Sequence, residues 1–552
     1  MASARARKVW AGGQASHLGG PSRDGRFLTI VDAATGDLAV REIAGGEVRR
    51  LTGSAPHPGE FAYFSVVSRD SRWIAYAWFN QQKFYDLRVI GADGRDQRTL
   101  QHNEERRFVQ PCAWSPDGKQ ILTLFFRNDN ISQITLVSAA DGAVKVLQSL
   151  DWVYPNKMDL SPDGKWVVYD DLLREGESAR GLFLLAADGS RKMALKPQVN
   201  DVFPLFTPDG GGIVFLSTRA GTTDLWLRPV NGGDPELLEK DLGRALPLGF
   251  TGAGDYYYAL RSGDPLVWIA ALDGAPTGAV AVGEGKEAPA WSPDGKRLAF
   301  LTRAGNENFG QESVVIAIYD IQARKLETLA PKLASLDHLR WSPDGKRFLA
   351  GGSDRHGERG LYVIDARTAA VKPVALTPAG TYRGFEGVWI REGEAVCFIQ
   401  PEEGTLRMGP LEGETRVIYR GPAKAKLHDL AVSADGRMAA FAVQSEGAEA
   451  VLALPLDGGE PRQAANVRGG AINGLEWGRD GQWLLASTPG DPPGLWRIAL
   501  DGTGPRKLDW NLQQQGAVRL DGPGRRIAYT AGKTQTEIRV IERLVHAAHH
   551  QR

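Results

Sequence analysis

The chain has 552 residues, too many for one ordinary hydrophobic core, so its length predicts either two domains or one array of repeats. Hydrophobic residues make up 42% of the sequence, which is enough for folded cores and argues against disorder. Lys plus Arg (66) equals Asp plus Glu (66), and this balance argues against nucleic acid or an anionic membrane as the partner, because both require a basic field.

The N-terminal segment MASARARKVWAGG is positively charged but lacks the apolar region of a secretory signal. No stretch reaches ~18 consecutive apolar residues, so we expect no membrane insertion by this chain. Taken literally, these features predict a soluble protein made in the cytoplasm. That expectation depends on where the natural gene product begins.

One short motif recurs along the whole sequence. It appears as WSPDGKRLAF from Trp291, as WSPDGKRFLA from Trp341, and in altered form at ten further positions. Asp24, Asp70 and Asp117 hold the same place in the first three copies, 46 and 47 residues apart. A steady period of this length indicates repeated supersecondary units, and four short strands per repeat are typical of a β-propeller blade.

The motif has the composition of a tight turn between two strands. Pro presets φ near about −65°, Asp tolerates the next turn position, and Gly takes the left-handed conformation that reverses the chain. Ser71 stands where the other copies have Gly, so that turn should be strained or differently shaped. Each motif Asp lies in its own hairpin, and we interpret the set as turn residues and not as a cation array.

The repeats predict an all-β protein of about twelve four-stranded blades. Because known propellers usually have four to eight blades, we favour two six-bladed rings over one ring of twelve. The simplest division gives a first ring over residues 1–280 and a second over residues 281–552. The last repeat lacks a fourth strand, and the segment near residues 5–10 resembles one, so we expect it to complete the last blade. Joining both termini in one blade would leave the two rings interleaved.

WSPDGK followed by RLAF resembles the WD40-like repeat (PD40) of the TolB family, which also occurs in tricorn-type and prolyl-oligopeptidase-type propellers. The resemblance extends from about Val9 to Glu542 and implies a β-propeller fold. It implies less about function, since this repeat serves many roles. TolB-like propellers are extracytoplasmic binding scaffolds, often periplasmic, and related propellers gate or cap peptidase domains.

The sequence contains no recognisable catalytic or cofactor motif. Gly-x-Ser-x-Gly, His-Glu-x-x-His and phosphate-binding loops are all missing, so we predict no catalytic residue, no metal and no cofactor. Cys112 and Cys397 lie in apolar strand-like runs and are expected to be buried, reduced thiols. The His-rich tail VHAAHHQR is interpreted as a frayed terminus.

Candidate binding residues lie in the segments that enter the first strand of each repeat. In propellers such loops open near the central channel, where ligands bind. The aromatic, acidic and imidazole side chains in these segments are Tyr63, Tyr154, Asp201, Glu287, Asp337, His338, His428 and Asp429. The alternative is that these are ordinary polar loop residues that face solvent and bind no ligand. The pairs His338–Asp337 and His428–Asp429 could suggest acid–base chemistry, but adjacent strand residues point to opposite faces.

An aromatic stretch, Phe61–Ile90, is open to two interpretations. We favour a well-packed blade, and the alternative is a surface that presents Phe79, Phe84 and Tyr85 to a partner.

The sequence therefore predicts a non-catalytic TolB-like scaffold that binds a protein or peptide on a ring face or at a channel mouth. Two alternatives remain. One is a propeller hydrolase or lyase acting on peptide or carbohydrate at a channel mouth, favoured if His and acidic side chains converge within ~3–5 Å around a pocket. The other is the sensor portion of a larger bacterial receptor.

Overall fold

A computed structural model gives the structure of the chain. It describes all residues except 1–5, 12–18, 54–58, 83, 130, 152, 174–178, 196–199, 264, 273–278, 286, 304–313, 355–357, 377–384, 402, 446–447, 468–471, 489–493, 509–516, 533–534 and 546–552.

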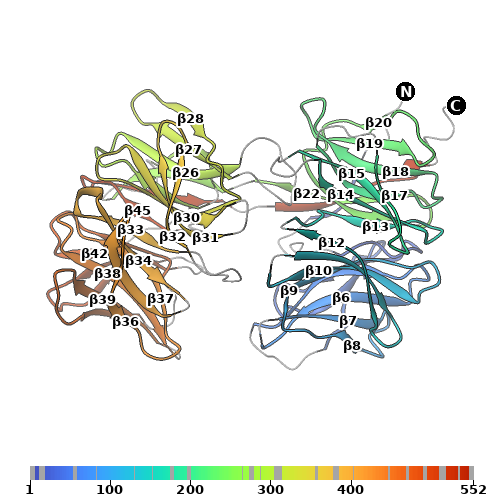
Figure 1. The fold of residues 1–552 in the computed structure, drawn as a ribbon, viewed down its shortest axis with the longest axis horizontal. Helices are drawn as coiled ribbons and strands as arrows, with labels where there is room; N and C mark the ends of the chain where they lie inside the picture. The colour runs from blue at the N-terminus through green and yellow to red at the C-terminus, as the bar shows by residue number, and fades with distance from the viewer. Residues whose placement is uncertain are drawn as a thin grey trace. The chain divides into compact units, whose positions relative to one another are not determined.

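The described residues form an all-β fold of antiparallel sheets (Figure 1). Eleven of these sheets have four strands and one has three, where about twelve four-stranded blades were expected. The exception is the first repeat. Here Gly19 N donates to Thr29 O (3.1 Å) and Pro21 forms only an isolated bridge to Leu28. Because Pro has no N–H, this segment cannot continue a regular ladder along β2 (Phe27–Val31).

The sheets fall into two compact units, which we call unit 1 and unit 2. Unit 1 contains six sheets. They are formed by β2, β3 (Leu38–Glu42) and β4 (Val48–Arg50); β5 (Phe61–Val67), β6 (Trp73–Phe79), β7 (Tyr85–Gly91) and β8 (Arg98–Gln101); β9 (Arg106–Trp114), β10 (Gln120–Arg127), β11 (Ile131–Ser138) and β12 (Val144–Asp151); β13 (Met158–Leu160), β14 (Trp166–Leu172), β15 (Arg180–Ala186) and β16 (Lys192–Ala194); β17 (Asp201–Phe206), β18 (Gly212–Ser217), β19 (Asp224–Pro229) and β20 (Glu236–Glu239); and β1 (Arg7–Ala11), β47 (Gln535–Ile541), β22 (Tyr256–Ser262) and β21 (Arg244–Phe250).

Unit 2 also contains six sheets. They are formed by β24 (Val280–Glu284), β23 (Leu266–Ala271), β46 (Arg526–Ala531) and β45 (Arg519–Leu520); β25 (Glu287–Trp291), β26 (Arg297–Arg303), β27 (Val314–Asp320) and β28 (Lys325–Leu329); β29 (Ser335–Trp341), β30 (Arg347–Ser353), β31 (Arg359–Asp365) and β32 (Val371–Leu376); β33 (Gly387–Ile390), β34 (Ala395–Gln400), β35 (Thr405–Pro410) and β36 (Arg416–Arg420); β37 (Lys426–Val432), β38 (Met438–Ser445), β39 (Ala448–Pro455) and β40 (Arg462–Val467); and β41 (Gly474–Trp477), β42 (Trp483–Thr488), β43 (Gly494–Ala499) and β44 (Pro505–Lys507). A 3₁₀ turn (Arg391–Gly393) follows β33.

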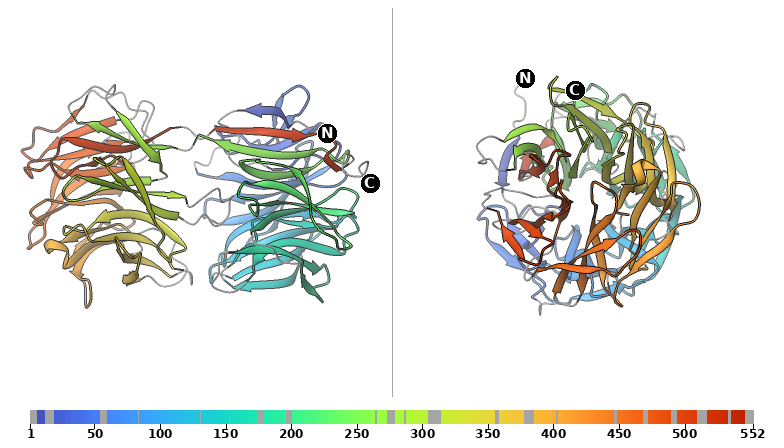
Figure 2. Two further views of the ribbon diagram at one scale, coloured as in Figure 1. Left: turned by 90° about the horizontal axis from the view of Figure 1, so that it is seen from above. Right: turned by 90° about the vertical axis from the view of Figure 1, so that its left-hand side faces the viewer.

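One sheet in each unit combines strands from distant parts of the sequence. In unit 1, β47 pairs with β22 on one side and with β1 on the other, and Figure 2 shows the red β47 beside the green β22. In unit 2, β46 pairs with β23. The chain therefore leaves unit 1 after Ser262, builds all of unit 2, and returns for its last strand. Because β23 belongs with β46, the units divide after residue 262 and not near 280, and the strand expected near residues 5–10 corresponds to β1.

The strand that precedes the recurrent turn of each repeat lies innermost, and successive inner strands contact one another around each unit. In unit 2 the order runs from β25 through β29, β33, β37 and β41 to β45, which contacts β25 again. In unit 1, where the first repeat has no regular inner strand, β2 contacts β5, and the order then runs through β9, β13 and β17 to β21. That cycle is closed by Leu28, which packs with Leu248 and Tyr257. Each unit is thus a closed ring of six sheets whose inner strands surround an axis, and we call the region along that axis the channel of the unit.

Tryptophan side chains join neighbouring sheets of unit 2. Trp477 Nε1 donates to Ala431 O (3.3 Å) in the preceding inner strand, and Trp291 Nε1 donates to Arg519 O (3.2 Å). The second bond joins the first and last repeats of the ring. The Arg526 guanidinium also lies 4.7 Å from the Trp291 ring centroid and donates to Gly295 O (2.5 Å). Aromatic packing and hydrogen bonds therefore close unit 2 together.

The recurrent motif forms the turns that follow the inner strands. In one copy Ser115 Oγ donates to Asp117 Oδ1 (2.6 Å) and accepts from Gln120 N (2.9 Å). The hydrogen bond from Ser115 and the backbone N–H of Lys119 lower the pKa of Asp117, so the Asp serves its own hairpin. Ser71 has φ +59°, which confirms that its turn takes a conformation strained for a residue with a Cβ. Its Oγ accepts from Asp24 N (3.2 Å) in the neighbouring repeat.

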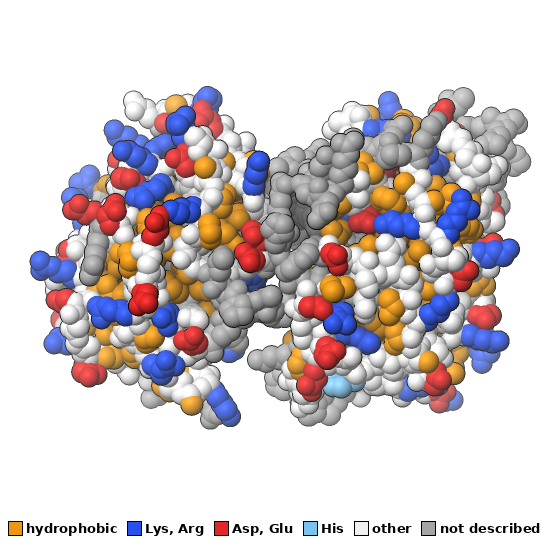
Figure 3. Space-filling model, viewed as in Figure 1, with side chains coloured by type: hydrophobic (Ala, Val, Ile, Leu, Met, Phe, Trp, Pro, Cys, Tyr) orange, Lys and Arg blue, Asp and Glu red, His pale blue; other side chains and the backbone are white. Residues whose placement is uncertain are grey.

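Charged side chains of both signs are interspersed over the face shown in Figure 3, as the equal numbers of acidic and basic residues suggest. Within the described residues, the structure has no helix that is long and apolar enough to span a membrane.

Candidate functional site

The inner strands direct alternate side chains into the blades and toward the channel. In β29, Leu339 and Trp341 are buried, whereas His338 and Arg340 are half-buried. Arg340 reaches Glu476 of β41, which lies three sheets away around the ring, so these side chains meet at the axis of unit 2. We call the charged residues gathered there the axial cluster. Its members are His338, Arg340, Glu386, His428, Asp429, Glu449, Glu476 and Arg519.

Glu476 is the common acceptor of two arginines in the axial cluster. Arg340 Nη1 lies 2.7 Å from Glu476 Oε1, and Arg519 Nη1 lies 3.2 Å from the same oxygen. Arg340 Nη2 also donates to Leu430 O (3.4 Å). Burial and the nearby Arg340 charge lower the pKa of Arg519 to about 10, which still leaves it charged at neutral pH. One carboxylate therefore holds together two guanidinium groups that repel each other.

His428 is held between two carboxylates. Its Nδ1 lies 2.7 Å from Asp429 Oδ2, and its Nε2 lies 3.1 Å from Glu449 Oε1. Alternation along β37 would send His428 and Asp429 to opposite faces. However, Asp429 has φ +56° and the register shifts between His428 and Ala431, so the two side chains meet. The pairing that strand alternation argued against is therefore produced by a β-bulge.

Glu386 lies just before β33 and connects two parts of the axial cluster. Its Oε2 accepts from Leu430 N (2.9 Å), and its Oε1 lies 3.7 Å from His338 Nε2. Burial opposes ionisation of Glu386, but the His338 imidazole and the Leu430 N–H outweigh it and lower the pKa of Glu386. The carboxylate is thus a stable anion beside an imidazole whose side chain is 34% exposed.

The protonation state of His428 determines whether this residue can transfer protons or only hold a fixed charge. Burial alone would lower the pKa of His428, but its hydrogen bonds to Asp429 and Glu449 raise that pKa to about 10. Burial raises the pKa of Asp429. His428 therefore remains an imidazolium at neutral pH with both ring nitrogens engaged. A general acid or base works best with a pKa near the operating pH, so His428 is better suited to holding a fixed charge than to transferring protons.

The other predicted residues lie elsewhere. Asp337 pairs with Arg359 (3.4 Å). Glu287 begins β25, but its side chain lies outside the described residues. Tyr63, Tyr154 and Asp201 belong to unit 1. The structure thus brings His338, His428 and Asp429 together in the axial cluster.

In unit 1, Tyr154 is exposed, with its ring 6.1 Å from that of Phe126. Asp201 is buried and pairs with Arg219 (2.5 Å). Tyr63 contacts Phe64, with the ring centroids 4.5 Å apart. These three positions come from different sheets and each has its own local neighbours.

The aromatic stretch of unit 1 packs mainly against itself. Ring centroids are 5.0 Å apart for Phe61–Phe79, Phe79–Tyr85 and Tyr85–Phe108, and all four side chains are half-buried. Burial raises the pKa of Tyr85 to about 12. These contacts agree with the packing interpretation, which the sequence favoured over a partner surface.

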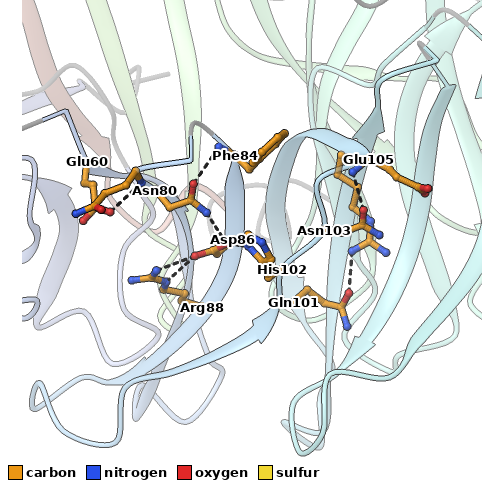
Figure 4. Close-up of polar contacts among 11 residues, drawn as sticks. Glu60, Asn80, Phe84, Asp86, Arg88, Gln101, His102, Asn103 and Glu105 are labelled. Carbon is orange, nitrogen blue, oxygen red and sulfur yellow. Dashed lines mark hydrogen bonds and ion pairs between the residues drawn. The ribbon is translucent and has the colours of Figure 1, made fainter. Parts of the chain in front are cut away.

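A polar network beside these rings is built on the buried carboxylate of Asp86 (Figure 4). Asp86 Oδ1 accepts from Asn80 Nδ2 (2.9 Å) and contacts His102 Nδ1 (2.7 Å), while Oδ2 accepts from Arg88 Nη2 (2.7 Å). Asn80 Oδ1 accepts from Phe84 N (3.0 Å) and so closes the loop between β6 and β7. The network orders that loop, since the Asp86 carboxylate already has donors on both oxygens.

Sequence reasoning missed five members of the axial cluster: Arg340, Glu386, Glu449, Glu476 and Arg519. A signal for three of them was present, because Arg340, Glu476 and Arg519 each directly precede the final residue of an inner strand. A charged residue at that repeated position faces the axis. Glu386 and Glu449 lie outside this pattern and are placed by tertiary contacts alone.

Closed rings of antiparallel sheets, with inner strands around an axis, define the protein as a β-propeller. Residues 67–242 match the family described as the TolB beta propeller domain, PD40, and this segment belongs to that family. The predicted resemblance to the TolB and PD40 repeat is thereby confirmed.

Three curated relatives are distant. The chain is 22% identical over 243 residues to an uncharacterized protein of Agrobacterium fabrum, covering 43% of this chain and 81% of that protein. It is 24% identical over 333 residues to dipeptidyl-peptidase 5 of Porphyromonas gingivalis, covering 48% of each. It is 24% identical over 164 residues to the Tol-Pal system protein TolB of Bordetella pertussis, covering 29% of this chain and 35% of TolB. The chain thus spans half or less of the last two relatives.

Proposed function

We propose that this protein is a non-catalytic interaction scaffold that binds a protein or peptide partner at the channel of unit 2. The observation that carries the proposal is the position of His428 between two carboxyl groups, one at each ring nitrogen. Together with Glu386 and Arg340 it presents immobilised charges at the axis of a closed ring. Preorganised charged groups recognise polar partners at little entropic cost.

The similarity to TolB supports a scaffold role. That relative is named as a component of the Tol-Pal system, and the matching family is a propeller domain. His338 and His428, with 34% and 26% of their side chains exposed, are the parts of the axial cluster that a partner would reach. We expect the partner to insert a polar segment, with hydrogen-bonding groups that match these imidazoles and Glu386.

Affinity capture with matched variants tests this proposal. Wild-type protein would be compared with His338→Ala and His428→Gln, and with His102→Ala as an exposed histidine control in unit 1. Candidate partners would then be purified and titrated directly against each protein. We expect the two unit 2 variants to weaken binding by about tenfold or more and the control to bind normally. A partner that binds all four proteins equally would place recognition elsewhere.

A second candidate function is a hydrolase or lyase acting on peptide or carbohydrate. It is favoured by the approach of His338 Nε2 to Glu386 Oε1 (3.7 Å), which puts a reachable imidazole beside an anionic carboxylate. The similarity to dipeptidyl-peptidase 5 covers only half of that relative. Turnover of a peptide or oligosaccharide library that is lost in His338→Ala and kept in His102→Ala would establish this candidate in place of the scaffold.

A further inference from the structure

The channel of unit 1 contains two arginines where other repeats have proline. Arg23 and Arg69 follow the turn serine in the first two repeats, at the place of Pro116 and Pro162 in the next two. A side chain at this place can reach across the ring. Arg69 Nη2 lies 3.2 Å from Leu160 O, and Arg23 Nη2 lies 3.4 Å from Pro208 O.

A lysine lies further along the same channel. Met158 and Leu160 are buried in the blade, so the alternating residues Lys157 and Asp159 face the axis. Lys157 Nζ lies 3.4 Å from Pro247 O of β21, two sheets away, which places the ammonium group across the ring. Asp159 accepts backbone N–H bonds from Leu160 (2.8 Å) and Phe206 (2.9 Å).

None of these three basic side chains forms an ion pair among the described residues. Within the described residues, no carboxylate oxygen lies within 4.0 Å of Arg23, Arg69 or Lys157. Burial and the Arg69 charge lower the pKa of Arg23, and burial lowers the pKa of Lys157. Burial also raises the pKa of Asp159, whose carboxyl group interacts electrostatically with all three. Within the described residues, no ion pair therefore engages the guanidinium groups of Arg23 and Arg69.

We propose that the channel of unit 1 binds a small oxyanion, a carboxylate or phosphate group, between Arg23 and Arg69, with Lys157 Nζ as a further hydrogen-bond donor deeper inside. Each guanidinium uses one nitrogen for backbone carbonyls, so most of its five N–H donors remain for a ligand. The planar guanidinium matches carboxylate and phosphate oxygens in pairs. All three side chains are partly accessible to solvent. This site is independent of the one proposed in unit 2.

Calorimetric titration of the full chain tests the site with two probes, inorganic phosphate and succinate, at constant ionic strength. We expect at least one probe to bind and the Arg23→Gln/Arg69→Gln double variant to lose about tenfold or more in affinity. Binding of phosphate alone or succinate alone would support the site and identify the ligand chemistry. Absence of binding by both probes would overturn the proposal.

A matched control excludes a general charge effect. Arg72 is exposed in the same turn as Arg69, so Arg72→Gln should bind the probes like the wild type. Equal losses in Arg72→Gln and in the double variant would also overturn the proposal. If thermal melting shows that the double variant is unfolded, Arg23→Gln and Arg69→Gln would be titrated singly. Each single variant should then weaken binding, and unchanged affinity in both would contradict the site.

Discussion

The two axial channels share one scaffold but differ in how their charged side chains are paired. In unit 2, Arg340 and Arg519 are both paired with Glu476, and His428 is paired with two carboxylates. In unit 1, the cations face backbone carbonyls and no carboxylate within ion-pair distance among the described residues. In the channel of unit 2 the charged side chains neutralise and hold one another in place. In the channel of unit 1 the guanidinium groups have no carboxylate partner within ion-pair distance in the described part of the chain, and so have donors available for a ligand.

The difference arises from a few positions in the repeated motif. Asp159 in unit 1 and Arg340 in unit 2 each directly precede the last residue of an inner strand, and Lys157 and His338 lie two residues earlier. The same places therefore carry different charges in the two rings. A propeller repeat fixes where a side chain points and leaves its chemistry free to vary, so function has to be inferred from these positions and not from the motif.

The largest expected effect comes from removing the shared acceptor of unit 2. Glu476→Gln leaves Arg340 and Arg519 facing each other without a carboxylate, and it should lower the free energy of unfolding of unit 2 by about 3 kcal/mol. Denaturant unfolding would measure the change. The exposed Lys325–Glu327 pair provides the control, because Glu327→Gln should change the stability little. Equal effects of the two substitutions would contradict the role given to Glu476.

The pH dependence of stability tests the His428 charge. Its folded pKa of about 10 lies above the unfolded value of 6.5, so its contribution is complete below pH 6.5 and is lost as the pH rises through 10. We expect the wild type to lose about 4 kcal/mol more than His428→Gln between these limits. Chemical denaturation at several pH values would measure the difference. Parallel pH profiles for the two proteins would show that His428 gains no proton affinity on folding.

Ring closure of unit 2 can be tested with two matched tryptophans. Trp291 and Trp341 are both buried, and each lies 4.7 Å from an arginine, but within the described residues only Trp291 Nε1 has an acceptor. Trp291→Phe should therefore cost about 1 kcal/mol more than Trp341→Phe. Thermal or denaturant unfolding would measure the difference. A larger loss in Trp341→Phe would rule out a role for the Trp291 hydrogen bond in closure.

The smallest effect is expected in unit 1. Arg69→Gln removes a cation that has no carboxylate partner, so the free energy of unfolding should change by less than about 0.5 kcal/mol. A large destabilisation, measured by denaturant unfolding, would mean that Arg69 is structural, and the contrast between the channels would then disappear.

Much of the fold could be predicted from the sequence because turns are local. Ser115, Asp117 and Gly118 make their hydrogen bonds within a few residues of one another, so each copy of the motif predicts a hairpin. The first repeat lost a regular inner strand because Pro21 cannot donate to the ladder. The loss of this ladder could be predicted from Pro21 only after the pairing of its segment with β2 was known.

The candidate site was harder to predict because its contacts are distant in sequence. Arg340 and Glu476 are 136 residues apart, and only ring closure brings them together. His428 and Asp429 were proposed from sequence, but their contact depends on the left-handed conformation of Asp429. No composition rule indicates a left-handed Asp inside a strand, so the pair could not be derived from alternation.

The central claim is that unit 2 holds fixed charges for recognition, and the protonation of His428 tests it most directly. NMR titration of the histidine rings, with His428→Gln to assign the signal, would measure its pKa in the folded protein. The account predicts that His428 stays protonated through neutral pH and titrates near 10. A pKa close to 6.5 would contradict it, because the imidazole would then be free to exchange protons as an acid–base group does.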